Sequence, residues 1–86
     1  MKRVLKFYSP TCGPCKVMSK KLEEVSKVTG VEVQDVDITD EDNESLIDEW
    51  KPRTVPTIIV MDTENNAVTE FKGIVPAEKI IEAING

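Results

Sequence analysis

The sequence predicts one α/β domain spanning residues 1–86, with a four-stranded mixed sheet and three flanking helices in the order β-α-β-α-β-β-α. Short β-branched runs alternate with segments whose apolar residues recur every three or four positions, which is typical of strands joined through helices. Two strand-like runs also follow one another across a short polar turn, which predicts an antiparallel hairpin. A chain of this length buries only about 60 to 65% of its unfolded surface, so we expect a single core with helices on both faces of the sheet.

The first predicted strand covers residues 4–8, an apolar and aromatic run that Ser9-Pro10 ends. From Pro14 the apolar spacing becomes helical, and the predicted helix ends at Gly30. Its apolar stripe consists of Cys15, Met18, Leu22, Val25 and Val28. We expect this stripe to face the core, with Cys15 on the buried side.

The middle of the chain predicts a second strand and a second helix. Residues 31–38 are β-branched and indicate the strand, whereas residues 41–51 have helical spacing and end before Pro52. Thr39 is expected to cap this helix. Its apolar residues at helical spacing are Leu46, Ile47 and Trp50.

The last third of the chain predicts a hairpin and a closing helix. The hairpin strands cover residues 56–61 and 67–71 around a turn at residues 64–66, and Gly73 ends the hairpin. Pro76 opens the last helix, which runs to the final residues of the chain. Its inward-facing residues are expected to be Ile80, Ile81 and Ile84.

Composition and charge limit the classes of function. With 16 acidic and 11 basic residues the net charge is −5, so nucleic-acid phosphates would repel this chain and we expect no nucleic-acid partner. No apolar stretch approaches the roughly 20 residues that a membrane span needs. The first residues also lack the pattern of a secretory signal. We therefore expect no membrane association and a cytoplasmic location.

Eight acidic residues lie between Asp35 and Glu49 without an intervening Lys or Arg. One interpretation is a docking surface for a basic partner. The other is a solvated helix start, because Asp40, Glu41 and Asp42 favour the positive end of a helix dipole.

Cys12-Gly13-Pro14-Cys15, followed by Lys16, indicates the chemistry of the chain. A helical turn brings two cysteines at this spacing within bonding reach, so one thiolate can attack a foreign disulfide and the other can resolve the mixed disulfide. Cys12 is expected at a helix N-terminus, where unpaired N–H groups, the helix dipole and the Lys16 charge stabilise a thiolate. We predict Cys12 as the nucleophile and Cys15 as the resolving thiol, with no cofactor.

A Cys-x-x-Cys pair can also supply half of a zinc site. The chain has two cysteines and no histidine, so a zinc site would need carboxylates or a second copy of the chain, and we expect no metal. A purely structural disulfide is disfavoured in a cytosolic protein and would constrain little chain.

Two motifs together carry a family resemblance. Residues 12–16 match the active site of thioredoxin, and Val55-Pro56-Thr57 matches the proline loop of that family. The chain resembles thioredoxin over nearly its whole length, including Gly73 and the closing helix. The resemblance implies a thioredoxin fold without the leading strand and helix of full-length thioredoxin, closer in size to glutaredoxin.

The resemblance further implies a cis Val55-Pro56 peptide bond in a loop that packs beside Cys12. In that geometry the Val55 backbone can pair with an extended target peptide. Thr54, Val55, Pro56 and Gly73 are therefore predicted to bind substrate. The alternative for Pro56 is a simple proline at the start of a strand.

The sequence departs from the family around and beneath the dithiol. Thr11 stands where thioredoxins usually have Trp, and Tyr8 and Trp50 are candidates to replace the lost apolar surface. Lys6 stands where thioredoxins usually have a buried Asp beneath the active site.

Asp35 on the second strand shares a face with Val33 and is expected to point inward. We expect a Lys6–Asp35 ion pair beneath Cys15, because either charge alone would be costly in a low-dielectric floor. Asp35, directly or through a water, is then a candidate to deprotonate Cys15. The alternative is that Lys6 extends to the sheet edge and Asp35 is solvated.

The leading functional prediction is a monomeric, thioredoxin-like protein-disulfide reductase. By resemblance, an NADPH-dependent thioredoxin reductase would supply its electrons, and ribonucleotide reductase or peroxiredoxin would be among its targets. A glutaredoxin-like enzyme recharged by glutathione is the first alternative, although Ile74 follows Gly73 where glutaredoxins have a second glycine. The second alternative is an interaction protein that uses the dithiol face without turnover. Disulfide formation or isomerisation is disfavoured by the missing export signal.

Overall fold

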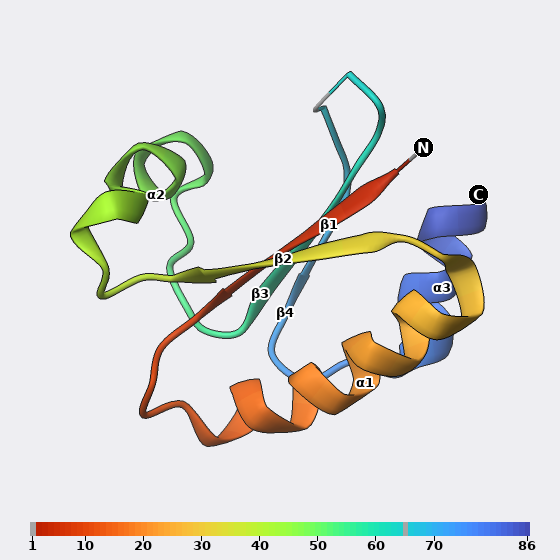
Figure 1. Cartoon of the computed structure of the whole chain (residues 1–86), viewed down its shortest axis with the longest axis horizontal. Helices are drawn as coiled ribbons and strands as arrows, with labels where there is room; N and C mark the ends of the chain where they lie inside the picture. Colours follow the sequence, from red (N-terminus) through yellow and green to blue (C-terminus); the bar gives the residue numbers. More distant parts are fainter. Residues whose placement is uncertain (1, 65) are drawn as a thin grey trace.

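Residues 2–64 and 66–86 are described by the computed structural model, which confirms the predicted order of strands and helices (Figure 1). The strands are β1 (Arg3–Tyr8), β2 (Glu32–Asp37), β3 (Thr57–Met61) and β4 (Ala67–Lys72). The helices are α1 (Gly13–Thr29), α2 (Glu44–Trp50) and α3 (Ala77–Asn85), and a short 3-10 helix, η1 (Glu41–Asn43), precedes α2.

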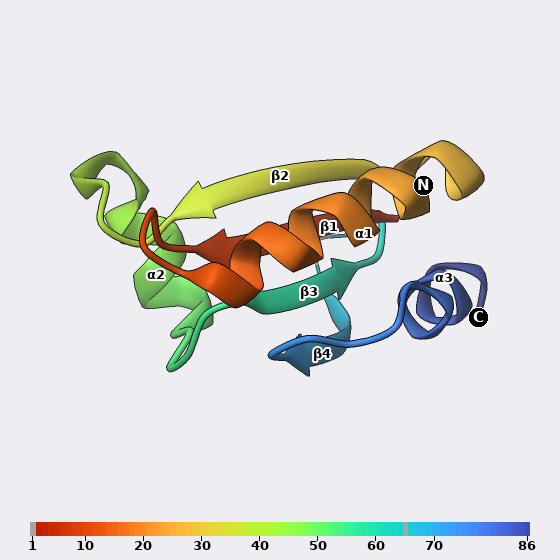
Figure 2. The same cartoon turned by 90° about the horizontal axis from the view of Figure 1, so that it is seen from below.

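The sheet has the strand order β2-β1-β3-β4. β1 pairs in parallel with β2 and antiparallel with β3, and β3 pairs antiparallel with β4. Figure 2 shows β3 running against the direction of β1 and β2. The two central strands are mostly buried, whereas the edge strands β2 and β4 carry exposed charged residues. The predicted mixed sheet is therefore confirmed.

Two apolar clusters form the core, one on each face of the sheet. α1 and α3 lie on one side and α2 lies on the other (Figure 1). Side chains alternate along the central strands, so Val4 and Ile58 join the α1 and α3 cluster while Leu5 and Ile59 join the α2 cluster. The apolar residues predicted on α2 and α3 all pack against these clusters: Leu46, Ile47, Trp50, Ile80, Ile81 and Ile84.

The stripe predicted on α1 is confirmed at Cys15, Met18, Leu22 and Val25, which are all buried. Val28 was also expected in the core, but it is 64% exposed, so that prediction is wrong. At 3.6 residues per turn Val28 lies about 100° from the centre of the stripe. Thr29 occupies the central direction instead, and its Oγ1 donates a hydrogen bond to the Val25 carbonyl oxygen at 2.7 Å. Gly30 then ends the helix with a φ of 75°.

The helix predicted for residues 41–51 is divided into η1 and α2. Thr39 is not its cap, because the Thr39 N–H and Oγ1 both donate to Asp37 Oδ1. Asp40 caps η1 instead, accepting a hydrogen bond from the Asp42 N–H at 3.0 Å. This carboxylate at a helix start agrees with the solvated interpretation of the acidic run.

The hairpin between β3 and β4 is confirmed in antiparallel register. The turn was predicted at residues 64–66, and Asn65 lies outside the described residues. The carboxylate of Asp62 accepts hydrogen bonds from the backbone N–H groups of Glu64 and Asn66, at 2.9 and 3.0 Å. This side chain therefore holds the start of the connection between the two strands.

Candidate dithiol site

The predicted site residues gather at one end of the sheet. The register pairs Phe7 with Thr57 and Thr57 with Lys72, so β1 ends where β3 begins and where β4 ends. The dithiol segment follows β1, the Val55-Pro56 loop precedes β3, and Gly73 follows β4. Three segments that are distant in the sequence therefore meet at the same end of the sheet.

The dithiol occupies the junction of β1 and α1. Cys12 is the N-cap of α1, with extended backbone angles, and its Sγ accepts a hydrogen bond from the Cys15 N–H at 3.1 Å. The two cysteines are joined as a disulfide. Cys12 is 9% exposed and Cys15 3%, whereas the intervening Gly13 and Pro14 are exposed. Cys12 is therefore the more exposed cysteine of the pair, and its sulfur lies at the N-terminus of the helix, against the Cys15 N–H.

Thr11 and Lys16 flank the cysteines, and both are exposed. Tyr8 and Trp50 were the two candidates to replace the missing Trp beside the dithiol. Tyr8 lines a cavity that both cysteines also line. Trp50 packs into the α2 cluster on the opposite face of the sheet. The prediction that Trp50 restores the surface around the dithiol is therefore wrong, because helical spacing directs this side chain into the core.

The Val55–Pro56 peptide bond is cis, as the resemblance implied. Pro56 is buried, and its carbonyl oxygen accepts a hydrogen bond from the Gly73 N–H at 2.9 Å. Gly73 has a φ of 76°, which is favourable only for glycine. Thr57 Oγ1 donates to the Thr54 carbonyl oxygen at 2.6 Å. These contacts fix the loop on both sides of the proline.

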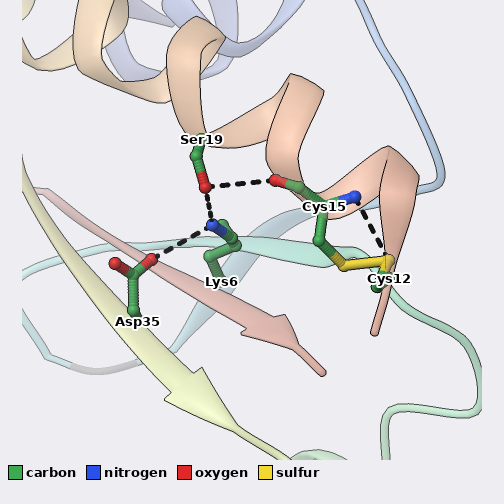
Figure 3. Close-up of polar contacts among 5 residues, drawn as sticks. All are labelled: Lys6, Cys12, Cys15, Ser19 and Asp35. Carbon is green, nitrogen blue, oxygen red and sulfur yellow. Dashed lines mark hydrogen bonds and ion pairs between the residues drawn. A yellow bond between two sulfur atoms is a disulfide. The ribbon is translucent and has the colours of Figure 1, made fainter. Parts of the chain in front are cut away.

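A polar cluster lies beneath the dithiol (Figure 3). Lys6 Nζ is 3.5 Å from Asp35 Oδ1, which confirms the predicted ion pair. Nζ also donates a hydrogen bond to Ser19 Oγ, and Ser19 Oγ donates to the Cys15 carbonyl oxygen at 3.1 Å. The Lys6 ammonium is therefore connected to the turn of α1 that carries the resolving cysteine.

The two members of the ion pair differ in burial. The Lys6 side chain is only 4% exposed, so it does not extend to the sheet edge, whereas the Asp35 side chain is 59% exposed. Asp35 lies on the face of the sheet that α1 covers, as predicted, and lines the same cavity as Lys6. Its side chain nevertheless stays largely exposed, because β2 is an edge strand.

Ser19 was missed in the sequence. The sequence shows a polar residue one helical turn after Cys15, but it does not show that this residue meets Lys6.

Both cysteines share a cavity of about 250 Å³ with the side chains of the polar cluster. Its charged and titratable lining residues, other than the cysteines, are Lys6, Tyr8, Lys16 and Asp35. Within residues 2–64 and 66–86, no group of three or more Cys, Asp and Glu residues is arranged to hold a metal ion. In the same described ranges, no helix is both long and apolar enough to cross a membrane.

Comparison with known proteins places this geometry in a family. The thioredoxin family model matches residues 1–86. Chloroplastic thioredoxin Y of Oryza sativa subsp. japonica is 33% identical over 78 residues, which cover 91% of this chain and 46% of that protein. Thioredoxin of Bacillus subtilis is 29% identical over 79 residues, covering 92% of this chain and 75% of that protein. A protein disulfide-isomerase of Datisca glomerata is 31% identical, covering 92% and 17%.

Solved structures agree with these matches. Thioredoxin of Fasciola hepatica superposes with a TM-score of 0.81 at 27% identity, covering 98% of this chain and 78% of that chain. A thioredoxin-like protein from Clostridium perfringens gives a TM-score of 0.88 at 25% identity, covering 99% and 69%. The predicted thioredoxin fold is therefore confirmed. The chain spans about half the length of the rice thioredoxin Y and 17% of the isomerase.

Proposed function

Because this chain belongs to the thioredoxin family, we propose that it is a thiol-disulfide oxidoreductase that reduces disulfide bonds of other proteins. The observation that carries the proposal is the position of Cys12 as N-cap of α1, with its sulfur accepting a backbone N–H. The same donors would stabilise a thiolate after reduction, since helix N-termini lower the pKa of cysteine thiols.

The proposed cycle uses the two cysteines in sequence. The Cys12 thiolate attacks one sulfur of the target disulfide, that bond breaks, and the second target sulfur leaves as a thiolate that takes up a proton from solvent. Cys15 then loses its proton and attacks the Cys12 sulfur, which releases the first target sulfur as a thiolate. The target gains two electrons, and the chain ends with the Cys12–Cys15 disulfide. The burial of Cys15 suits it to this second, intramolecular step.

The target is proposed to bind along the proline loop. Among the described residues, the backbone N–H and C=O of Val55 make no hydrogen bond, while Pro56 is held by Gly73. An extended segment of the target can therefore pair with Val55 by strand addition. Thr54, which is exposed, would line the same approach to Cys12.

We propose that the oxidised chain is recharged by an NADPH-dependent thioredoxin reductase, which returns two electrons and two protons to the dithiol. Ribonucleotide reductase and peroxiredoxin are the proposed target classes, and a monomer in the cytoplasm is the proposed working form. Glutathione is the less favoured donor. The Gly73 N–H is occupied by Pro56, and the next residue is the exposed Ile74 rather than a second glycine.

Reduction of insulin disulfides tests the function, because reduced insulin B chains precipitate and scatter light. The parent protein should accelerate precipitation in the presence of dithiothreitol, and Cys12→Ser should abolish the acceleration. In the absence of dithiothreitol, the reduced Cys15→Ser variant should instead accumulate a mixed disulfide with insulin, visible as a mass increase that added dithiothreitol then removes. No acceleration by the folded parent protein would refute the proposal.

A second experiment separates the alternatives. NADPH consumption is compared with thioredoxin reductase and with glutathione plus glutathione reductase, and we expect turnover with the first donor system. Faster turnover with glutathione would favour the glutaredoxin-like alternative. Biological activity that survives the Cys12→Ser, Cys15→Ser double substitution would favour an interaction protein.

A further inference from the structure

We propose that Lys6 is a positioning residue whose positive charge favours the reduced dithiol over the disulfide, and that Asp35 moderates this effect. The inference rests on the proposed function and adds the group that sets the redox balance of the site. It starts from an unusual placement, since lysine side chains are rarely buried without a close partner, and this one lies beneath the cysteines.

The contacts of Lys6 direct its charge toward the dithiol. Its side chain is 4% exposed and its Nζ is bonded to Ser19 Oγ, which in turn donates to the Cys15 carbonyl oxygen. In Figure 3 the ammonium lies between the Asp35 carboxylate and the turn of α1 that carries Cys15. The charged group nearer to the dithiol is therefore the cation, and Asp35 reaches it from the solvent side.

The surroundings of the cavity leave this charge only partly neutralised. The other charged or titratable groups that line it are Tyr8 from β1, Lys16 from α1 and Asp35 from β2. Tyr8 places its ring 5.1 Å from Nζ. Lys16 is exposed and screened by water, and Asp35 is 59% exposed. The buried, low-dielectric side of the cavity thus contains the Lys6 ammonium, whereas its counter-charge, the Asp35 carboxylate, is largely hydrated.

The change in charge on reduction gives the direction in which Lys6 shifts the redox equilibrium. The disulfide is neutral, whereas reduction adds two electrons and, when one cysteine is ionised, a single proton, leaving a thiolate. A nearby cation stabilises the thiolate and leaves the neutral disulfide almost unaffected. Removing the cation should therefore favour the disulfide, and removing the carboxylate that neutralises it should favour the dithiol.

Equilibration with glutathione tests this directly, since one protein disulfide and two glutathione thiols exchange for one dithiol and one glutathione disulfide. Lys6→Met should lower this equilibrium constant about tenfold, which corresponds to roughly 30 mV. Asp35→Asn should raise it by a few-fold. Ser19→Ala, which releases Lys6 from the turn of α1, should lower it by a smaller factor than Lys6→Met.

Matched controls remove the same charges elsewhere. Lys27→Met deletes an exposed lysine in the last turn of α1, and Glu32→Gln deletes an exposed carboxylate at the start of β2, the strand that carries Asp35. Both should leave the equilibrium constant unchanged within about twofold, because exposed charges are screened at physiological salt. Lys6→Met is expected to fold, since a buried charge can be replaced by an apolar group of similar size.

The opposite signs are the decisive result. A merely structural role would shift Lys6→Met and Asp35→Asn in the same direction, and that outcome, or shifts no larger than those of the controls, would overturn the inference. Titration of the thiolate absorbance near 240 nm gives a second reading, in which Lys6→Met should move the midpoint to higher pH and Asp35→Asn to lower pH. If Lys6→Met did not fold, a fall in the constant for Asp35→Asn would still refute it. None of these measurements uses a protein substrate, so they remain valid if insulin is not reduced.

Discussion

At the scale of single residues, glycine is required at one of the two predicted site positions and not at the other. Gly73 has a φ of 76°, and its N–H holds the Pro56 carbonyl oxygen. Gly13 stands at the start of α1, and a Cβ added there would meet nothing within 4 Å. Gly13 thus has space for a side chain away from its chain neighbours, although the following Pro14 disfavours helical backbone angles for a residue with a Cβ.

Substitution of these two glycines should change stability by different amounts. Gly73→Ala is expected to lower the free energy of unfolding by about 1 to 2 kcal/mol, because the left-handed backbone region is costly for any residue with a Cβ. Gly13→Ala should change it by less than about 0.5 kcal/mol, since the restriction of the unfolded chain by alanine is offset by the contact of its Cβ with the following Pro14. Urea unfolding followed by circular dichroism measures both. Equal losses for the two variants would show that the space around Gly13 is not free.

At the scale of elements, α1 positions the resolving cysteine through its apolar stripe. Met18 lies one turn after Cys15, is fully buried, and packs in the α1 and α3 cluster. Val28 belongs to the same helix and is 64% exposed. The helix therefore offers an internal comparison between a core contact and a surface position.

Met18→Ala should lower the free energy of unfolding by about 2 to 5 kcal/mol, because it leaves a cavity in a packed core. Val28→Ala should change it by less than about 0.5 kcal/mol, as expected for an exposed position. Denaturant titration of the two variants under identical conditions makes the comparison. A large loss of unfolding free energy for Val28→Ala would show that Val28 is packed in the core.

The end of α2 carries a local conformational cost. Lys51 is its C-cap and has a φ of 47°, the left-handed region, although it is not a glycine. Lys51→Gly should therefore raise the free energy of unfolding by up to about 1 kcal/mol, whereas Lys27→Gly within α1 should lower it by about as much. Thermal unfolding of both variants is the test, and a loss of stability for Lys51→Gly would contradict the prediction.

The elements were predictable where periodicity alone decides the structure. The apolar run of β1 predicts a strand that is buried on both faces, and the three-and-four spacing from Cys15 to Val25 predicts a helix that is buried on one face. Periodicity gives the face on which a side chain lies, but it does not show how far the neighbouring elements cover that face. Val28 and Asp35 are more exposed than predicted, because Val28 lies off the centre of the α1 stripe and Asp35 lies on an edge strand. Thr39 does not cap the helix, because its N–H and Oγ1 donate hydrogen bonds to the nearby Asp37 carboxylate instead.

At the scale of the whole molecule, the disulfide closes a loop of very few residues, since the two cysteines are three positions apart. Chain entropy then contributes only about 2 kcal/mol to stability. Both cysteines are buried, but neither belongs to the apolar clusters on the two faces of the sheet. The packing that holds the fold is thus separate from the bond that changes during the proposed cycle.

The reduced chain should therefore stay folded. Addition of dithiothreitol is expected to leave the far-ultraviolet circular dichroism spectrum unchanged and to alter the free energy of unfolding by about 2 kcal/mol or less. Urea titrations with and without the reductant measure the difference. Loss of helical signal on reduction would show that the disulfide is a structural bond.

The site as a whole was predictable only in part. The cysteine spacing and the proline motif identified two of its segments, and a resemblance, not a periodicity, implied that they meet. The register then shows why they meet, since the end of β1 lies beside the start of β3. Ser19 required three-dimensional information, because its contact with Lys6 depends on how α1 crosses β1.

The hydrogen bonds of Lys2 have a practical consequence. Lys2 Nζ donates to the carbonyl oxygens of Ala83 and Gly86, the latter at 2.7 Å, so the start of β1 and the last turn of α3 meet at the end of the sheet away from Cys12 (Figure 1). A bead, an electrode or an affinity tag attached through Gly86 would therefore lie at the opposite end of the sheet from the dithiol. Immobilised protein should thus retain access to large targets.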